Sequence, residues 1–408
     1  MLFYRFKPCF ENVSKVFFYF EEPATRRFSV WAHDFQFSGN TPPRKAVVIL
    51  EEFSCKTRIV AGAGAISALS HWEGKRAFLV TDPFFVQNGW AQRIVSLLGG
   101  PVEIFDGVVP DPTVALAAEG TARLKAFSPE VVVALGGGSA MDCAKAMAFF
   151  GKGEYALVAI PTTSGSGSEV TDFAILTHDG VKHPLVDARL RPDEAILDSD
   201  LLQELPKGLI AQAGFDAISH AVESYVAKNG GTVTELLARE AFSMAFAALP
   251  ASYAGRKDVR LKVHLASTLA GLSFTQAGLG LCHGLSHALG GRFHVAHGVL
   301  NAVLLPAVVS SNALVAGKQY AELARGAGLG GSADAIGVRN LKNGLIRLRR
   351  ELNLPETLAQ AGIPPREIWR NADALVEATL ADPCCATNPM EVEGFLVRRI
   401  LEEVTGRG

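Results

Sequence analysis

The segment VVVALGGGSAMDCAKAMAFF, residues 131–150, decides the fold class of this chain. Five apolar residues run without interruption into Gly136, Gly137 and Gly138, and Ser139 then begins a pattern with helical period. A continuous apolar run is typical of a strand buried on both faces, and a parallel sheet needs helical connections. The segment therefore predicts an α/β fold.

Apolar runs of the same kind occur on either side of this segment. Strand candidates lie at residues 57–61, 77–81, 102–105 and 156–160, with helical patterns at 112–127 and 139–150. Strands that alternate with helices in this way predict a parallel, Rossmann-like sheet covered by helices on both faces.

The character of the sequence changes near residue 200. Helical periods then dominate, at residues 208–227, 232–249, 259–275 and 337–352. Two prolines, Pro192 and Pro206, and the polar stretch LDSDLLQELPKG place a domain boundary there. We expect an N-terminal extension of unknown role at 1–51, an α/β domain at 52–200 and an all-helical domain at 201–408.

Composition narrows the class of ligand. The chain has 408 residues, of which 49% are hydrophobic, so it can bury a large core. A formal charge of -2 and dispersed Lys and Arg argue against nucleic acid or an anionic membrane as partner, and favour a small molecule. Six cysteines without a CxxC pair fit a reducing cytoplasm. The uncharged stretch 298–317 contains polar residues and a proline, so we interpret it as a buried helix rather than a membrane span.

Two loops rich in glycine and hydroxyl groups follow neighbouring strands. They are GGGS at 136–139 and IPTTSGSGSEVT at 160–171. Glycine lets backbone N–H groups approach a pyrophosphate, and loops after parallel strands converge on one crevice. A tight turn without a ligand, or a flexible surface loop, would explain either loop alone. The pair favours a dinucleotide.

Asp82 follows the strand candidate 77–81. A carboxylate there can accept hydrogen bonds from an adenosine ribose and repel a 2′-phosphate. It precedes the glycine loop, whereas the acid of the common Rossmann fingerprint follows that loop by about twenty residues. A helix N-cap is therefore the competing explanation for Asp82.

A metal site is predicted in the second half of the chain. In GFDAISHAVESYV, Asp216 and His220 are four residues apart and share one face of a helix. The segment GLCHGLSHALGGRFHVAHGVLNA, residues 280–302, then holds four of the ten histidines, namely His283, His287, His294 and His297. A lone histidine is more often a core or surface residue than a ligand, but this clustering favours a metal.

The ligand set remains open at this point. Gly290 and Gly291 are expected to end the helix of the first two of these histidines, so that His297 returns through a loop. Spacing does not decide which three of the five histidines join Asp216, and Cys282 should point off the ligand face. Three imidazoles and one carboxylate suit Fe²⁺, Zn²⁺ or Mn²⁺ and leave a position open for a substrate oxygen, which is a catalytic pattern.

At these residues the chain resembles the iron-containing (group III) alcohol dehydrogenase family, from about residue 57 to the C-terminus. The motifs that carry the resemblance are FDGVVPDPT, GGGSAMDCAKA, IPTTSGSGSEVT, PDEAILD, FDAISHAVESYV and HGLSHALGGRFHVAHGVLNA. Through ASTLAGLSFTQAGLGLCHGLSHALGG the chain is most similar to the propanol and ethanol dehydrogenases of bacterial propanediol and ethanolamine utilisation.

The resemblance implies a dehydroquinate synthase-like fold and assigns the site. It implies metal ligation by Asp216, His220, His283 and His297. It makes His287 an active-site histidine that is not a ligand, and His294 a bystander. The residues that match the family's dinucleotide contacts are Asp82, Gly137, Gly138, Ser139, Thr162, Thr171 and Lys182. An acid at position 82 favours NAD over NADP.

We therefore expect a hydride transfer between NAD(H) and a short-chain primary alcohol or its aldehyde, with Fe²⁺ or Zn²⁺ as Lewis acid. His287 is the candidate proton relay, because histidine titrates in the needed range. One alternative is a glycerol dehydrogenase-like or dehydroquinate synthase-like enzyme on the same fold, whose metal sites generally differ. The other is a non-catalytic assembly subunit, which has no need for converging Asp and His side chains.

The resemblance also bears on partners and location. It implies a homodimer or a larger homo-oligomer in the cytoplasm, with association with a bacterial microcompartment as an open alternative. We expect neither a nucleic acid nor a membrane partner. Residues 1–51 have no recognised counterpart in the family, and a partner-binding or encapsulation segment, a domain fragment and an upstream translation start are all open explanations.

Overall fold

A computed structural model of the chain describes residues 17–21, 28–32, 47–48, 51–178 and 181–406. The chain divides into two compact units, Met1–Phe53 and Ser54–Gly408. In the first unit, an antiparallel sheet is formed by β1 (Phe17–Glu21), β2 (Phe28–Ala32) and β3 (Val47–Val48). These strands were not predicted, because consecutive aromatic residues in FFYFE hide the alternation that marks a strand. Apart from Glu51, the rest of the predicted extension lies outside the described residues.

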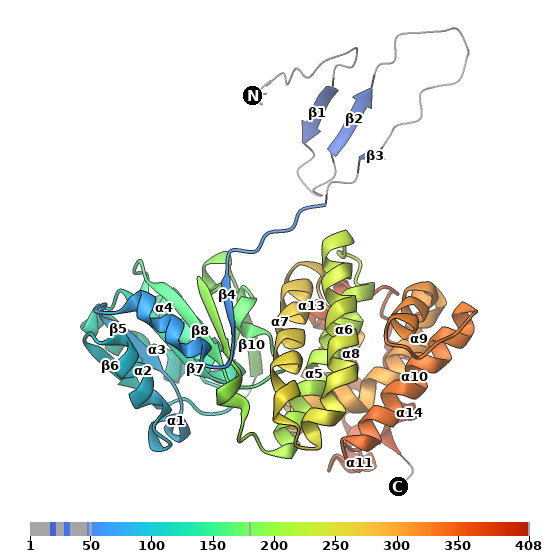
Figure 1. Cartoon of the computed structure of the whole chain (residues 1–408). Coiled ribbons are helices and arrows are strands. Elements are labelled where there is room, and N and C mark those ends of the chain that lie inside the picture. Colours follow the sequence, from blue (N-terminus) through green and yellow to red (C-terminus); the bar gives the residue numbers. More distant parts are fainter. Residues whose placement is uncertain (1–16, 22–27, 33–46, 49–50, 179–180, 407–408) are drawn as a thin grey trace. The chain divides into compact units, whose positions relative to one another are not determined.

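The larger unit begins with a six-stranded parallel sheet (Figure 1). Its strands, in the order β4-β11-β8-β7-β5-β6, are β4 (Arg58–Gly62), β11 (Glu194–Asp198), β8 (Ala156–Pro161), β7 (Val131–Gly136), β5 (Ala77–Val80) and β6 (Val102–Phe105). Every predicted strand is present within one residue of its predicted limits. The prediction of a parallel sheet is confirmed.

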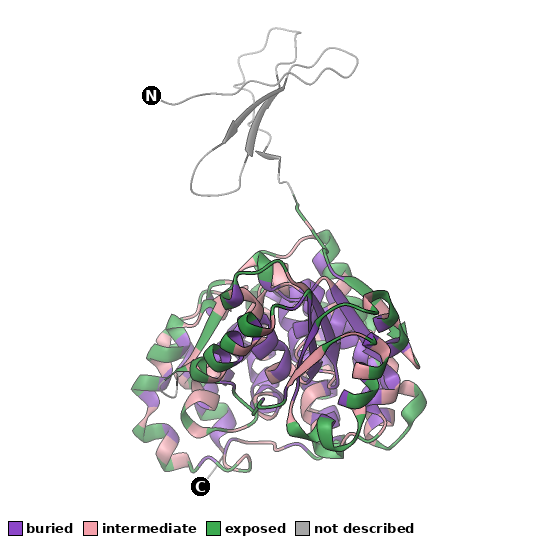
Figure 2. Ribbon diagram, turned by 90° about the vertical axis from the view of Figure 1, so that its left-hand side faces the viewer, coloured by how far each residue is buried: buried purple, intermediate pink, exposed green. Residues whose placement is uncertain are grey.

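Helices cover both faces of this sheet. They are α1 (Pro83–Gln87), α2 (Trp90–Leu98), α3 (Val114–Phe127) and α4 (Gly138–Gly151), with the short helices η1 (Ala65–Trp72), η2 (Ser168–Val170), η3 (Ala188–Leu190) and η4 (Ser199–Leu202). Along β7, Val131, Val133 and Leu135 pack in one apolar cluster with η1, α1 and α2. Val132 and Ala134 pack in another with α3 and α4. Successive side chains leave opposite faces of a strand, so the continuous apolar run serves both layers. Figure 2 shows the buried sheet between helices whose outer sides are exposed.

Three strands of the larger unit were not predicted. β9 (Phe173–His178) and β10 (Val181–Val186) form an antiparallel hairpin outside the main sheet, and β11 lies within it. In β10, Lys182 and Pro184 interrupt the apolar run that marks a strand. In β11, acidic residues stand at both ends, Glu194 and Asp198, and both are buried.

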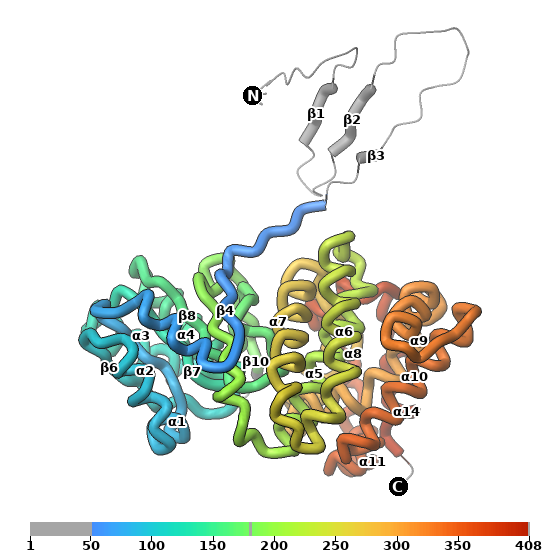
Figure 3. Tube along the Cα trace, viewed as in Figure 1, coloured from blue at the N-terminus to red at the C-terminus, as the bar shows by residue number. Residues whose placement is uncertain are grey.

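The rest of the unit is helical and shares one apolar core. The helices are α5 (Lys207–Val226), α6 (Thr232–Tyr253), η5 (Lys257–Val259), α7 (Arg260–Ala277), α8 (Leu281–Phe293), α9 (His297–Gly326), α10 (Asp334–Glu351), α11 (Pro365–Arg370), α12 (Ala372–Ala381), α13 (Pro383–Ala386) and α14 (Gly394–Thr405). Figure 3 traces the chain from the sheet, in blue and green, to these helices, in yellow to red. The predicted order of an α/β part followed by a helical part is confirmed.

α9 contains the uncharged stretch 298–317. Among the described residues it is the single helix that is long and apolar enough by itself to cross a membrane, and 72% of its most apolar window is buried inside the structure. The bent pair of helices from Lys257 to Phe293 passes the same test together. α9 packs against α5 and α10, as a core helix does.

Candidate metal centre

One face of α5 carries the first part of the site. Asp216, His220 and Glu223 are spaced by four and three residues, so their side chains leave the same side of the helix. The side chain of Asp216 is 13% exposed, and His220 and Glu223 are buried. Groups of this kind, removed from water, need polar partners or a cation.

Two further helices bring histidines to this face. His283 lies in the first turn of α8, and His297 is the first residue of α9. The Nε2 atom of His283 is 3.8 Å from Oδ1 of Asp216, and Nε2 of His297 is 3.7 Å from the same oxygen. The three side chains offer donor atoms that all lie within 4.8 Å of one another. The structure thus brings together three of the four predicted ligands, each from a different helix.

His220, the fourth predicted ligand, lies beside this group. Its ring stacks on Phe274, with centroids 4.4 Å apart, and on His283, with centroids 4.6 Å apart. Its Nδ1 atom is 3.2 Å from the carbonyl oxygen of Gly165. A carbonyl oxygen only accepts, so Nδ1 is the donor and Nε2 is the nitrogen that remains for a cation.

The turn that leads into His297 differs from the prediction. Gly290 and Gly291 were expected to end α8, but the helix continues to Phe293. The amide of His294 donates to the carbonyl oxygen of Gly290 at 2.9 Å, and His294 itself has the left-handed φ of 55°. Glycine inside a helix is less favourable than alanine by only about 1 kcal/mol, so packing overrides it here. His294 is exposed and serves as the cap.

His287 belongs to a second polar group. Its Nδ1 atom is 2.8 Å from Oδ2 of Asp382, and its ring stacks on His297 with centroids 5.1 Å apart. His287, Asp382 and Cys384 also offer donor atoms within 4.8 Å of one another. The contact with Asp382 occupies Nδ1 and leaves Nε2 as the second functional nitrogen. Sequence reasoning missed Asp382 because it lies 95 residues beyond His287.

Asn301 was also not singled out from the sequence. Its Nδ2 atom donates to Oδ1 of Asp216 at 2.7 Å, and its Oδ1 atom accepts from the Ser286 hydroxyl at 2.5 Å. The Cys282 thiol lies 3.5 Å from Oδ1 of Asn301 and does not belong to the group of donor atoms around Asp216, as expected. Asn301 follows His297 by four residues, and that spacing was the available signal for its position.

Charge interactions shape the titration of these groups. Burial alone would lower the pKa of His283, but its hydrogen bonds with Asp216 and Glu223 raise it to about 9. Burial would raise the pKa of Asp216, but the charges of His220 and His297 hold it far below its usual range. Burial lowers the pKa of His220 to about 4. The site therefore favours a positive charge beside its carboxylates and keeps the His220 lone pair available near pH 7.

The donor set fits a divalent transition metal. One carboxylate and imidazole nitrogens are suitable ligands for Fe²⁺ and Zn²⁺. The distances of 3.7 and 3.8 Å from Oδ1 of Asp216 are close to the roughly 3–3.5 Å that separates ligands bonded at about 2.1 Å. A small inward movement brings the donors to bonding distance.

The glycine loop lies at the carboxyl end of β7. α4 begins at Gly138, with Gly137 as an N-cap that has no side chain to occupy the first amides of the helix. Gly136 has a φ of 149°, a conformation that glycine adopts readily. A Cβ atom on Gly137 or Gly138 would come within 3.3 Å of Thr163 or Ser166. The two loops thus lie against each other, as predicted, next to the amides of a helix N-terminus.

Asp82 combines two features. Its Oδ1 atom accepts from the amide of Phe84 at 2.9 Å, so Asp82 is the N-cap of α1. Its Oδ2 atom lies toward the glycine loop, 3.7 Å from the position that a Cβ on Gly136 would take. Ser139 occupies the first turn of α4. Asp82 is therefore a helix N-cap, which was the competing explanation. Its second carboxylate oxygen still lies on the side of the glycine loop.

Two of the remaining residues predicted to contact the dinucleotide have polar partners within the protein. Thr162 and Thr171 are buried, and the Thr171 hydroxyl lies 2.9 Å from Nζ of Lys145. The Nζ atom of Lys182 lies 2.6 Å from Oδ1 of Asp111. Lys145, which the sequence analysis did not single out, therefore holds part of the second loop from inside.

The loop between β8 and β9 joins the two parts of the site. Its Gly165 carbonyl accepts from His220, and its Ser166 lies against Gly138. The group with metal-ligand chemistry and the glycine loop are therefore neighbours through one short segment. Hydride transfer needs a cofactor and a substrate held close together in this way.

Comparison with known proteins gives a consistent result. The family model described as "Iron-containing alcohol dehydrogenase" matches residues 56–199, and "Fe-containing alcohol dehydrogenase family, C-terminal" matches residues 210–405. The 1-propanol dehydrogenase PduQ of Salmonella typhimurium is 36% identical, covering 87% of this chain and all of that protein. The NADPH-dependent butanol dehydrogenase of Clostridium saccharobutylicum is 33% identical, covering 86% of this chain and 97% of that protein. The structure of a sulfoacetaldehyde reductase from Bifidobacterium kashiwanohense in complex with NAD⁺ superimposes with a TM-score of 0.79 at 25% identity, covering 88% of this chain and 100% of that one.

Proposed function

Because the chain belongs to the iron-containing alcohol dehydrogenase family, we propose that it interconverts short-chain primary alcohols and their aldehydes with NAD(H). Activity as an alcohol dehydrogenase or aldehyde reductase follows from the family. The choice of substrate, cofactor and residues is the proposal. The observation that carries it is the convergence of Asp216, His283 and His297 on one point beside the glycine loops.

The proposed metal ligands are Asp216, His220, His283 and His297, and the proposed metal is Fe²⁺, with Zn²⁺ as an equally suitable occupant by donor chemistry. Bound there, the cation supplies Lewis acidity to the substrate oxygen while the nicotinamide supplies or accepts the hydride. His220 and His283 are buried and Asp216 is 13% exposed, so most of the proposed ligands are held by the surrounding protein. That supports a site held in one geometry before substrate arrives.

His287 is proposed as the residue that moves the proton. During alcohol oxidation the hydroxyl proton has to leave the site, and Nε2 of His287 is the nitrogen that Asp382 does not occupy. Asp382 accepts the Nδ1 proton and so fixes the ring. In aldehyde reduction the same nitrogen returns the proton to the oxygen.

The dinucleotide is proposed to lie along the glycine loop. The amides of Gly137, Gly138 and Ser139 at the start of α4 suit the pyrophosphate. Thr162, Thr171 and Lys182 are assigned to the cofactor by the resemblance of their motifs. The relatives differ in cofactor, since one is named NADPH-dependent and another was solved with NAD⁺.

The preference for NAD rests on Asp82. Its Oδ2 atom lies on the side of the glycine loop, where a carboxylate repels the 2′-phosphate of NADP.

The substrate, the domain limits and the assembly are also part of the proposal. The relative named a 1-propanol dehydrogenase supports propanal and 1-propanol as the first substrates to try. Domains at 52–200 and 201–408 agree with the last strand ending at Asp198 and α5 beginning at Lys207. By family resemblance we also propose a homo-oligomer in the cytoplasm or in a microcompartment. Size-exclusion chromatography with light scattering measures the oligomeric state.

NADH oxidation with propanal and acetaldehyde tests the function. The full chain is stripped of metal and restored anaerobically with Fe²⁺ or Zn²⁺. Activity should require the metal and be lost in His283→Ala. The matched control is His294→Asn, which changes an exposed histidine of the same segment and tolerates its left-handed backbone. Equal activity in the two variants would contradict the proposed ligand set.

A further inference from the structure

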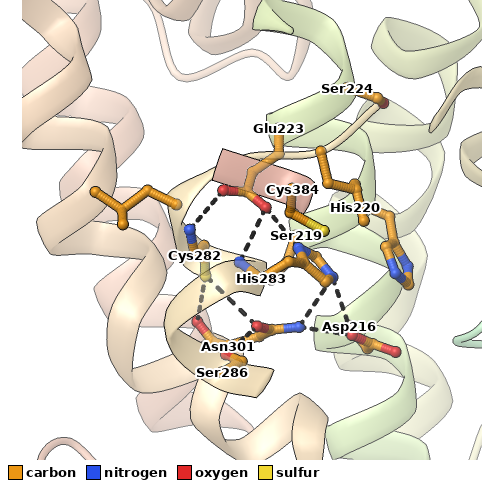
Figure 4. A network of polar contacts seen from close by, with 12 residues as sticks. Asp216, Ser219, His220, Glu223, Ser224, Cys282, His283, Ser286, Asn301 and Cys384 are labelled. Carbon is orange, nitrogen blue, oxygen red and sulfur yellow. Dashed lines mark hydrogen bonds and ion pairs between the residues drawn. The ribbon is translucent and has the colours of Figure 1, made fainter. Parts of the chain in front are cut away.

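Glu223 makes three contacts with the start of α8 (Figure 4). Its Oε1 atom accepts from the amide of Cys282 at 2.7 Å, and Oε2 accepts from the amide of His283 at 3.3 Å. Oε2 also lies 2.5 Å from the Nδ1 atom of the His283 ring. A carboxylate buried to this degree, on a helix rich in apolar residues, is retained only where it is well paired.

These contacts complete the N-terminus of α8. Its N-cap residue, Gly280, has no capping side chain, so the first amides need partners from elsewhere. Asn388 accepts from the amide of Leu281 at 3.1 Å, and Glu223 accepts from the next two amides. A Cβ on Gly280 would lie 2.8 Å from both Oε1 of Glu223 and Oδ1 of Asn388, so glycine lets both side chains approach.

The same contacts define which nitrogen of His283 carries the proton. A carboxylate only accepts, so Nδ1 is the donor to Glu223. On the other side, Nδ2 of Asn301 lies 3.3 Å from Nε2 of His283. The Ser286 hydroxyl donates to Oδ1 of Asn301, which turns the amide nitrogen toward the ring. Glu223 therefore fixes a proton of His283 on Nδ1, which leaves Nε2, the nitrogen that lies toward Asp216, as the one that a cation can bind.

We propose that Glu223 is a positioning residue of the metal centre, which holds the His283 ring in the tautomer and orientation that present Nε2 to the cation. The inference rests on the proposed metal centre. Glu223 shares the face of α5 that carries Asp216 and His220, so it fixes ligands from two helices relative to each other. Partners of this kind on metal-bound histidines commonly contribute 10–100-fold to metal affinity.

The test measures Zn²⁺ binding by the full chain in competition with a chelator, without substrate or cofactor. Glu223→Gln keeps the size of the side chain, but its amide cannot accept from both Cys282 and His283. Glu223→Asp keeps the charge and retracts the carboxylate by about 1.5 Å. Ser224→Ala is the matched control, because the buried Ser224 hydroxyl donates to Ala221 within the same helix. We expect dissociation constants about 10–100-fold higher for both Glu223 variants and unchanged for the control.

A loss in Glu223→Gln with full affinity in Glu223→Asp would show that charge alone matters and would overturn the positioning role. Affinity within twofold of wild type in both variants would also overturn it.

Nuclear magnetic resonance of the Zn²⁺-loaded wild-type protein, with ¹⁵N-labelled histidine, gives a readout that does not depend on the variants. His283 should carry its proton on Nδ1, with a strongly downfield resonance from the contact with Glu223. A proton on Nε2 would overturn the inference. Failure of the wild type to bind Zn²⁺ or Fe²⁺ would instead remove the metal centre itself, and the inference with it.

Discussion

Replacement of Lys145 by methionine tests how the second loop of the cofactor site is held. Lys145 lies in α4, is 1% exposed and has a pKa that burial lowers to about 8. Its Nζ atom lies 2.9–3.0 Å from four acceptors, which share its three N–H groups: the Ser168 hydroxyl, the hydroxyl and carbonyl of Thr171 and the carbonyl of Phe173. Lys145→Met removes all of these hydrogen bonds while it keeps an unbranched side chain.

The size of the effect follows from the buried charges. Ser168 also donates to Asp142, whose pKa burial raises, so the lysine offsets a buried carboxylate. Removal of one member of such a group destabilises a protein by about 3–5 kcal/mol. With an unfolding entropy of about 2.1 cal/mol/K per residue, the larger unit should lose roughly 4–7 °C in Tm. The loop that Lys145 holds also lies against the glycine loop. When this loop is released, KM for NADH should rise about tenfold, which corresponds to about 1.4 kcal/mol.

Differential scanning calorimetry of the metal-loaded protein measures Tm, and initial rates at saturating aldehyde measure KM for NADH. Lys125→Met is the matched control, since Lys125 is an exposed lysine of the neighbouring α3 and should change stability by less than about 0.5 kcal/mol. A Tm of Lys145→Met within 1 °C of wild type, with an unchanged KM, would refute the account of the loop.

Three further changes test other parts of the site. Asp82→Ser should raise the kcat/KM ratio of NADPH to NADH at least about tenfold in steady-state assays, because it removes the charge that opposes a 2′-phosphate, and an unchanged ratio would contradict the assignment. Gly298→Ala should reduce the free energy of unfolding by about 3 kcal/mol in urea titrations, because its Cβ would overlap the carbonyl of Gln212, and a wild-type midpoint would argue against this packing. Asp382→Asn should lower kcat about tenfold with KM and bound metal unchanged, because a neutral amide replaces the charged acceptor of the His287 Nδ1 proton and can also turn its NH2 group toward that nitrogen, whereas loss of metal would point to a structural role instead.

The main sheet was predictable because its strands are short apolar runs bounded by turns, as at residues 131–136. β11 was not, because only three apolar residues separate Glu194 from Asp198, and its place between β4 and β8 is a long-range property. A local sequence pattern indicates whether a segment is buried and which secondary-structure period it has. It does not indicate which distant strand pairs with that segment.

The residues of the site likewise divide into those that local spacing predicted and those that it left open. Helical spacing placed Asp216 and His220 on one face, and the helix confirms that geometry. Spacing left the other ligands open, because the path between α8 and His297 depends on a helix end that packing shifted to His294. Only the resemblance of motifs singled out His297.

The residues that contact His283 and His287 could not be predicted from sequence spacing. Glu223 contacts His283 across 60 positions, and Asp382 contacts His287 across 95. Such pairs leave no periodic signal in one sequence. They become visible only when the helices are packed.

The most direct test of the metal centre is anomalous diffraction at the iron absorption edge, from crystals of the full chain grown anaerobically with Fe²⁺. The account predicts a peak at about 2.0–2.2 Å from a carboxylate oxygen of Asp216 and from Nε2 of His220, His283 and His297. A peak at His287, Asp382 and Cys384 instead, or none in protein that oxidises NADH with aldehyde, would contradict it.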